Sequence, residues 1–303
     1  ATASGPPRGD RAGYLPFLIP GLVLFVVVIG VPFVANIGIS LTRWQGVGPA
    51  DWAGLDNYRR LLTDTAFWAS FRHNVALILA MAVVPTAIGL VIASALFVFV
   101  GKRVGPRAAG VLRACIYLPQ LLPVAVAGIV WGWILAADQG ALNELLGAGG
   151  LGSWARDWLG DPAFALLSVG VILVWVQLGY PVVIFMAGLQ RVDPQLYEAA
   201  EIDGASWWRR FWHVTLPQIR PETYVVLLWC TIAALKVFAP IYVLTRGGPG
   251  GATTVPAYLS YQNFFEKTQV GYGAAIATVL AAVILLLTMV FLRVQARAEE
   301  ADR

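Results

Sequence analysis

The polar stretch at residues 191–221 carries side chains suited to binding a partner. Glu198 and Glu201 are three residues apart, so both carboxylates should lie near one helix face, and the alanines between them leave a shallow surface that another protein can approach. Aromatic and basic residues follow, a mixture that suits a membrane interface: Trp207, Trp208, Arg209, Arg210, Phe211 and Trp212. The alternative is an interfacial amphipathic hairpin without a partner.

The punctuation of this stretch predicts two short helices with a sharp bend. Asp193 can cap the first helix, and Pro194 fits its first position, where the missing N–H is no loss. Gly204 can take the left-handed conformation that ends a helix. Ser206 is placed to cap the second helix, which Pro217 should end. We therefore expect a helix-bend-helix.

A second group of candidates consists of polar and aromatic residues inside apolar stretches. Such groups are costly at membrane depth and are functional by default, with interhelical hydrogen bonding as the alternative. The candidates are Trp175, Gln177 and Tyr180 in the fourth apolar stretch and Lys236, Phe238 and Tyr242 in the fifth.

The elements that position these residues are membrane spans. The 303 residues are 58% hydrophobic and 13% charged, and soluble domains usually contain about a quarter charged residues. Each of six stretches is long enough to cross a bilayer. The predicted spans are Tyr14–Leu41, Asn74–Val100, Val111–Ala136, Ala163–Gln190, Glu222–Thr245 and Tyr272–Arg293. The segment Gly54–Asn74 reads as an amphipathic helix on the outer surface.

The distribution of basic residues predicts the orientation. Thirteen Lys and Arg fall on the side of the termini and the 191–221 loop, against seven on the other side. The positive-inside rule then places both termini and this loop in the cytoplasm. We expect a disordered tail at 1–13, a six-helix transmembrane domain at 14–293 and a second cytoplasmic tail at 294–303. The net charge of +4 is scattered and forms no stripe for nucleic acid.

Several kinds of chemistry lack their residues. The chain has no Gly-rich loop ending in Gly-Lys-Ser/Thr, so it should not hold ATP. Cys115 and Cys230 lie in apolar runs without partners at ligand spacing, which favours buried free thiols. His73 and His213 fall on opposite sides of the predicted membrane, which argues against a metal site or a catalytic dyad.

The 191–221 stretch resembles the EAA loop of permeases from binding-protein-dependent ABC importers. The shared pattern is EAA, then GA, then a hydrophobic run closing on LP, and the wording EAAEIDGA is most similar to the carbohydrate-uptake branch. GLDNYRRLLTD, YLPQLLPVAVAGIVWGWIL and LTRGGPGGATT also resemble family segments. The resemblance implies an all-α, six-helix, type I (maltose-permease-like) fold. It assigns coupling to an ATPase to Glu198, Ala199, Ala200, Asp203, Gly204, Ala205, Leu216 and Pro217.

The resemblance also implies the partners and the function. They are a second related permease, an ATPase dimer that binds ATP and Mg, and an extracytoplasmic solute-binding protein or lipoprotein. The chain itself would be no enzyme and hold no cofactor, and it would sit among lipids of the bacterial inner membrane. The sugar-contacting segments would be those around Leu178-Gly179 and before the LTxGGP turn. Trp175, Ala234 and Val237 replace maltose-contacting asparagines, so maltose itself is not implied.

Three alternatives remain open at this point. The substrate of an importer could instead be glycerol-3-phosphate or a related polyol phosphate. A self-contained secondary carrier would need an ionisable residue inside the spans and usually an inverted repeat, whereas Lys236 is the only clear internal charge. A structural membrane scaffold would use the loop only for docking.

Overall fold

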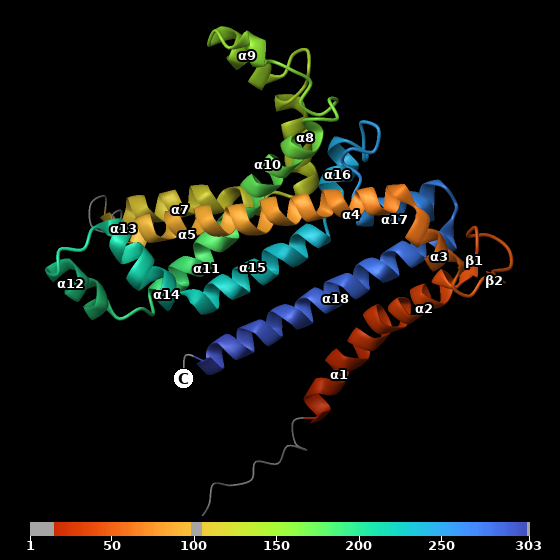
Figure 1. Ribbon diagram of the computed structural model, residues 1–303, viewed down its shortest axis with the longest axis horizontal. Helices are drawn as coiled ribbons and strands as arrows, with labels where there is room; N and C mark the ends of the chain where they lie inside the picture. The colour runs from red at the N-terminus through yellow and green to blue at the C-terminus, as the bar shows by residue number, and fades with distance from the viewer. Residues whose placement is uncertain (1–14, 98–104, 302–303) are drawn as a thin grey trace, which may run out of the picture.

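The computed structural model describes residues 15–97 and 105–301, and the predicted tail at 1–13 lies outside them. Long helices form the body (Figure 1), with the 191–221 loop at one end and a pair of two-residue strands at the other. Within the described residues, four helices are long and apolar enough to cross a bilayer, or five if one bent pair is a single span. The predicted count of six spans therefore stays a prediction.

The first apolar rod contacts the rest of the chain mainly through the last helix. It consists of α1 (Leu15–Phe25), the π-helical turn η2 (Val26–Gly30) and α2 (Val31–Ser40). The Asn36 side chain of α2 donates hydrogen bonds to the Ala274 carbonyl at 3.2 Å and to the Thr278 hydroxyl at 3.0 Å. An antiparallel pair, β1 (Thr42–Arg43) and β2 (Asp51–Trp52), follows and is a small addition to the predicted all-α fold.

The second rod begins earlier than predicted. The expected surface helix Gly54–Asn74 is split into α3 (Asp56–Thr63) and the start of α4 (Thr65–Ile78). Asp64 causes the division, because its backbone is extended and its carboxylate accepts hydrogen bonds from the N–H groups of Ala66 and Phe67. The π-helical turn η3 (Leu79–Val83) and α5 (Val84–Ala95) complete the rod, with Pro85 in the first turn of α5, where it needs no donor.

The third predicted span is bent. α7 (Gly105–Leu121) and α8 (Val124–Ile134) meet at 96°. Pro123 separates them because it lacks an N–H to continue the helical ladder. The segment after α8 carries α9 (Ala141–Ala148) and the 3₁₀ turn η5 (Gly152–Trp154), which project away from the body (Figure 1).

The remaining helices carry both groups of candidate residues. The fourth rod is α10 (Ala165–Gln177) and α11 (Gly179–Leu189), followed in the loop by α12 (Pro194–Ile202), α13 (Trp207–Arg210), η6 (Phe211–Thr215) and α14 (Leu216–Gln218). The fifth predicted span is divided into α15 (Arg220–Leu235) and α16 (Ala239–Leu244). The chain ends in α17 (Pro256–Tyr261), η7 (Gln262–Glu266) and α18 (Val270–Ala301).

Buried side chains form a core at the loop end of the body. Phe185 and Leu189 of α11 pack in one cluster with Val226 and Cys230 of α15. Phe211, from the loop, belongs to the same cluster and is buried. The loop is therefore packed on the helices that it connects.

Candidate functional site

The 191–221 loop has the predicted helix-bend-helix shape. The Asp193 carboxylate accepts a hydrogen bond from the Gln195 N–H at 2.9 Å and caps α12. Gly204 has φ of +70°. The N–H of Ala205 donates to the Ala200 carbonyl at 2.9 Å, which closes the end of α12. Ser206 caps α13 through its hydroxyl. These features confirm the predicted caps and bend.

The prediction that Pro217 ends the second helix is wrong. The helical path runs from α13 through the π-helical turn η6 into α14, where Pro217 occupies the first turn. The first turn of a helix does not need every backbone N–H as a donor. Pro217, which has no N–H, is therefore tolerated there, directly after the π-helical turn. The chain interrupts its helical path two residues later, at Ile219, and α15 begins at Arg220.

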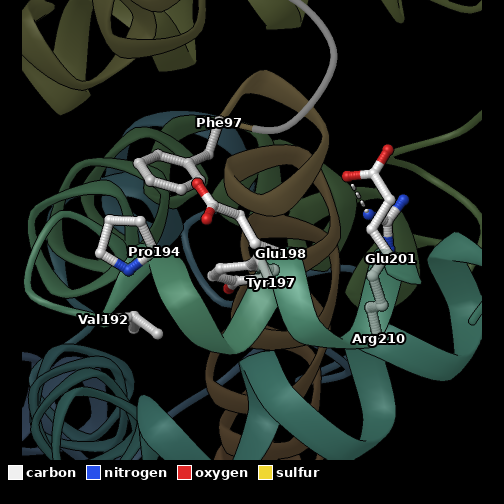
Figure 2. A pocket seen from close by; sticks show the side chains of 7 residues that line it. All are labelled: Phe97, Val192, Pro194, Tyr197, Glu198, Glu201 and Arg210. Carbon is white, nitrogen blue, oxygen red and sulfur yellow. Dashed lines mark hydrogen bonds and ion pairs between the residues drawn. The ribbon is translucent and has the colours of Figure 1, made fainter. Parts of the chain in front are cut away.

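The first helix of the loop borders a pocket of about 250 Å³ (Figure 2). Its lining residues are Phe97, Val192, Pro194, Tyr197, Glu198, Glu201 and Arg210. Both glutamates thus lie near one face, as predicted. Arg210 forms an ion pair with Glu201 at 3.2 Å, whereas Glu198 is exposed and points toward Phe97 in Figure 2. Both glutamate side chains are exposed, but only Glu201 has an ion-pair partner among the described residues.

Tyr197 joins the two arms of the loop. Its hydroxyl lies 3.0 Å from the Thr215 hydroxyl. Burial raises the pKa of Tyr197, although the Thr215 hydrogen bond and the nearby Arg210 charge oppose the rise. The hydroxyl therefore keeps its proton at neutral pH and can donate across the loop.

The second helix of the loop exposes an aromatic face. Trp208 and Trp212 are 56% and 57% exposed, while Phe211 is buried between the loop and the helices. The exposed indoles suit either the membrane interface or a partner protein. Ala199, Asp203, Ala205, Leu216 and Pro217 lie on the same short helices and their bend.

The predicted substrate-path residues of the fifth span lie at a break in that span. Lys236 is exposed at the end of α15, and α16 begins at Ala239. The rings of Phe238 and Tyr242 stack with centroids 5.7 Å apart. The structure therefore brings these two residues together at non-regular backbone, which membrane proteins tolerate where it is buried in protein or lines a cavity.

Two further tyrosines belong to this aromatic cluster and were missed from the sequence. Tyr261 of α17 lies 5.0 Å from Phe238 and 5.4 Å from Tyr242 between ring centroids. Tyr258 lies 6.3 Å from Phe238. Their spacing of three residues, soon after the LTxGGP turn, puts both rings on one helix face and could have identified them. We call Phe238, Tyr242, Tyr258 and Tyr261 the aromatic cluster.

The candidates of the fourth span make separate contacts. Trp175 packs against Trp131, with centroids 5.5 Å apart, and Tyr180 stacks on Trp229 at 5.2 Å. The Gln177 amide is buried and donates a hydrogen bond to the Cys230 sulfur at 3.4 Å. For Gln177 the structure therefore shows interhelical hydrogen bonding, which was the alternative to a substrate contact.

Leu178 and Gly179 form the junction between α10 and α11. A Cβ on Gly179 would lie 3.0 Å from Tyr117 Cα, so this position allows α7 and α11 to approach closely. The candidate residues of the fourth span thus contribute to helix packing, whether or not they also line the predicted substrate path.

Two neighbouring residues of α4 hold the segment that carries the aromatic cluster. The Asn74 side chain is buried and donates to the Ala234 carbonyl at 3.0 Å, just before the break. His73 Nδ1 lies 2.9 Å from the carbonyl oxygen of Thr254, after the LTxGGP turn. Both ends of the irregular segment are therefore fixed from another helix.

Comparison with known proteins gives the family. The profile described as "Binding-protein-dependent transport system inner membrane component" matches residues 87–300. A probable ABC transporter permease of Pyrococcus horikoshii is 35% identical, over 94% of this chain and 96% of the relative. The trehalose/maltose transport permease MalF of Thermococcus litoralis is 35% identical, over 95% and 94%. The chain belongs to the family of binding-protein-dependent transport system inner membrane components.

A solved structure supports the same fold. A bacterial ABC transporter that imports the acidic polysaccharide alginate contains a chain that matches with a TM-score of 0.80. The match covers 93% of this chain and 94% of that chain at 20% identity. The predicted ABC importer permease fold is confirmed, and the relatives are permease subunits. The chain is therefore a multi-pass membrane transport subunit and not an enzyme.

Proposed function

We propose that this chain is one permease half of an ABC importer that takes up a carbohydrate delivered by an extracytoplasmic binding protein. The observation that carries the proposal is the capped, bent loop at one end of the body, with an exposed Glu198 on its first helix. The trehalose/maltose permease of Thermococcus litoralis and the diacetylchitobiose permease NgcF of Streptomyces coelicolor, 33% identical over 96% of this chain, support the substrate class.

The proposed complex has three partners for this chain. A second related permease completes the translocation path, a dimer of ATPase subunits binds ATP and Mg, and a solute-binding protein delivers the sugar. The 191–221 loop docks on the ATPase through Glu198 and its neighbouring alanines. Nucleotide binding then moves α12, and the paired permeases change from facing inward to facing outward. A full reversal of such an equilibrium needs about 5.5 kcal/mol of differential binding.

The aromatic cluster supplies the sugar contacts in this proposal. Phe238, Tyr242 and Tyr261 are partly exposed and offer ring faces to apolar sugar C–H surfaces, and their tyrosine hydroxyls can bond rim hydroxyls. Lys236 of the fifth predicted span and Trp175 of the fourth are further candidates. In the membrane, Trp208 and Trp212 contact lipid at the cytoplasmic interface.

The experiment is purification of the tagged chain with its co-purifying subunits, followed by reconstitution into proteoliposomes. Uptake of a panel of radiolabelled mono-, di- and trisaccharides is then measured with and without ATP and binding protein. We expect uptake of at least one sugar that depends on both. Uptake driven by an ion gradient without ATP would support a secondary carrier instead.

The orientation is tested separately. We propose that both termini and the loop are cytoplasmic, and that α9 and η5 lie outside. In a background with Cys115 replaced by serine, Ser153→Cys should react with an impermeant thiol reagent in spheroplasts. Ser206→Cys should react only after permeabilisation. Both positions are exposed, so access to the reagent depends on the side of the membrane. The reverse pattern contradicts the orientation.

A further inference from the structure

Glu222 is a buried carboxylate at the start of α15. Its side chain is 9% exposed. It lies against Gly188 of α11, where an added Cβ would be 2.7 Å from the Glu222 Cγ atom. The Glu222 side chain of α15 therefore fits against α11 because residue 188 has no side chain.

The charge of Glu222 is balanced by Arg191. Arg191 follows the end of α11 directly and forms an ion pair with the Glu222 carboxylate, while its own side chain is 73% exposed. In the described part of the chain, no other ion pair involves Glu222. A buried carboxylate needs such a partner, because leaving it unpaired is strongly unfavourable.

These two residues are the entry and the exit of the 191–221 loop. Arg191 is its first residue, and Glu222 comes directly after its last. Between them, Val192 and Ile219 are buried in the same core cluster as Leu189. The ion pair therefore closes the base of the loop, and the apolar cluster packs beside it.

We infer that Arg191 and Glu222 are positioning residues that make the loop and the two spans beside it move together. If only its two backbone connections held the loop to the spans, the loop could pivot about Arg191 and Arg220 when α12 is displaced. The ion pair opposes that pivot, so displacement of α12 is passed to α11 and α15. This inference rests on the proposed function, in which an ATPase displaces α12.

The test uses the reconstituted complex and measures sugar moved per ATP hydrolysed, with the sugar of the panel that wild type takes up fastest. The main variant is the double substitution Arg191→Met/Glu222→Gln, which leaves no unpaired charge. Arg191→Lys keeps the ion pair. Arg220→Met is the matched control, because Arg220 is an exposed arginine at the same loop base and has no ion pair among the described residues.

We expect the double variant to assemble and hydrolyse ATP while moving about tenfold less sugar per ATP, a size typical of coupling between sites. Arg191→Lys and Arg220→Met should stay close to wild type. If the double variant moves as much sugar per ATP as wild type, the inference is wrong, even when less complex assembles. If wild-type complex shows no ATP-driven uptake, the proposed function itself is wrong.

Discussion

The 191–221 loop and the segment 236–261 differ in what determines their shapes. In the loop, Asp193, Gly204 and Ser206 set the helix ends through contacts within a few residues. In the segment, backbone at the break is held by Asn74, which is 160 positions from its partner in sequence. The proposed docking surface is thus shaped by local contacts, whereas the proposed sugar site is shaped by contacts with a neighbouring helix.

The largest effect should come from breaking the local design at Gly204. Its φ of +70° is unfavourable for most side chains, and most of all for β-branched ones, although nothing lies within 4 Å of an added Cβ. Gly204→Val should cost about 1–2 kcal/mol locally and shift α12, with most ATP-driven uptake lost. Gly204→Asn is the control, because asparagine tolerates this conformation. Equal activity of the two variants would show that backbone conformation at the bend is unimportant.

The next prediction concerns the long-range hydrogen bond between Asn74 and Ala234. Asn74→Leu removes the buried donor to the Ala234 carbonyl and should destabilise the protein by about 1–3 kcal/mol while weakening sugar uptake. Asn36→Leu is the matched control, because it removes a side-chain amide hydrogen bond between α2 and α18. It should lower the melting temperature without changing the KM for uptake. A KM change of the same size in both variants would contradict a specific role for Asn74.

A smaller effect should follow from the aromatic cluster. Tyr261→Ala removes a ring that contacts both Phe238 and Tyr242 and should raise the KM for sugar about threefold, the size of one aromatic contact. Phe265→Ala is the control, because that ring is 66% exposed and lies beside Tyr261 at the edge of the cluster. An unchanged KM in Tyr261→Ala would remove the ring from the path.

The smallest expected effect concerns Asp64, which accepts hydrogen bonds both from adjacent N–H groups and from the distant Tyr272. Burial alone would raise its pKa, but hydrogen bonds from Tyr272 and from the Ala66 and Phe67 N–H groups, with the Arg60 charge, hold the pKa below 3.8. A lowered folded-state pKa means that ionised Asp64 contributes stability above its ordinary pKa and loses it as the pH falls through the folded value.

Tyr272→Phe removes the long-range bond and keeps the two N–H bonds of the cap. We expect its melting temperature in detergent to be about two degrees below wild type at pH 7. That difference should shrink as the pH falls through the folded-state pKa of Asp64, because the protonated carboxyl no longer gains from the charge-assisted bond. A difference that is constant with pH would mean that the ring packing of Tyr272, and not its bond to Asp64, is responsible.

The same contrast explains what the sequence could predict. The caps of α12 and α13 were predictable because each depends on a few adjacent residues. A proline inside a predicted span indicates a kink or a break, but the angle of 96° at Pro123 could not be predicted. The break at Lys236 was not predictable, because lysine in an apolar run is compatible with a straight span. Tyr258 and Tyr261 were missed because their contacts with Phe238 depend on how α17 packs beside α16. The pairing of Arg191 with Glu222 likewise required the distance between two helices.

The most direct test of the account is whether Glu198 docks the ATPase. Glu198→Lys reverses an exposed charge on α12, and Glu144→Lys makes the same change on α9, far from the loop (Figure 1). Each tagged variant is purified from membranes, and the ATPase subunit recovered per permease is quantified. The account predicts about a tenfold loss of ATPase with Glu198→Lys and wild-type recovery with Glu144→Lys. Equal recovery with the two variants would contradict docking through this loop.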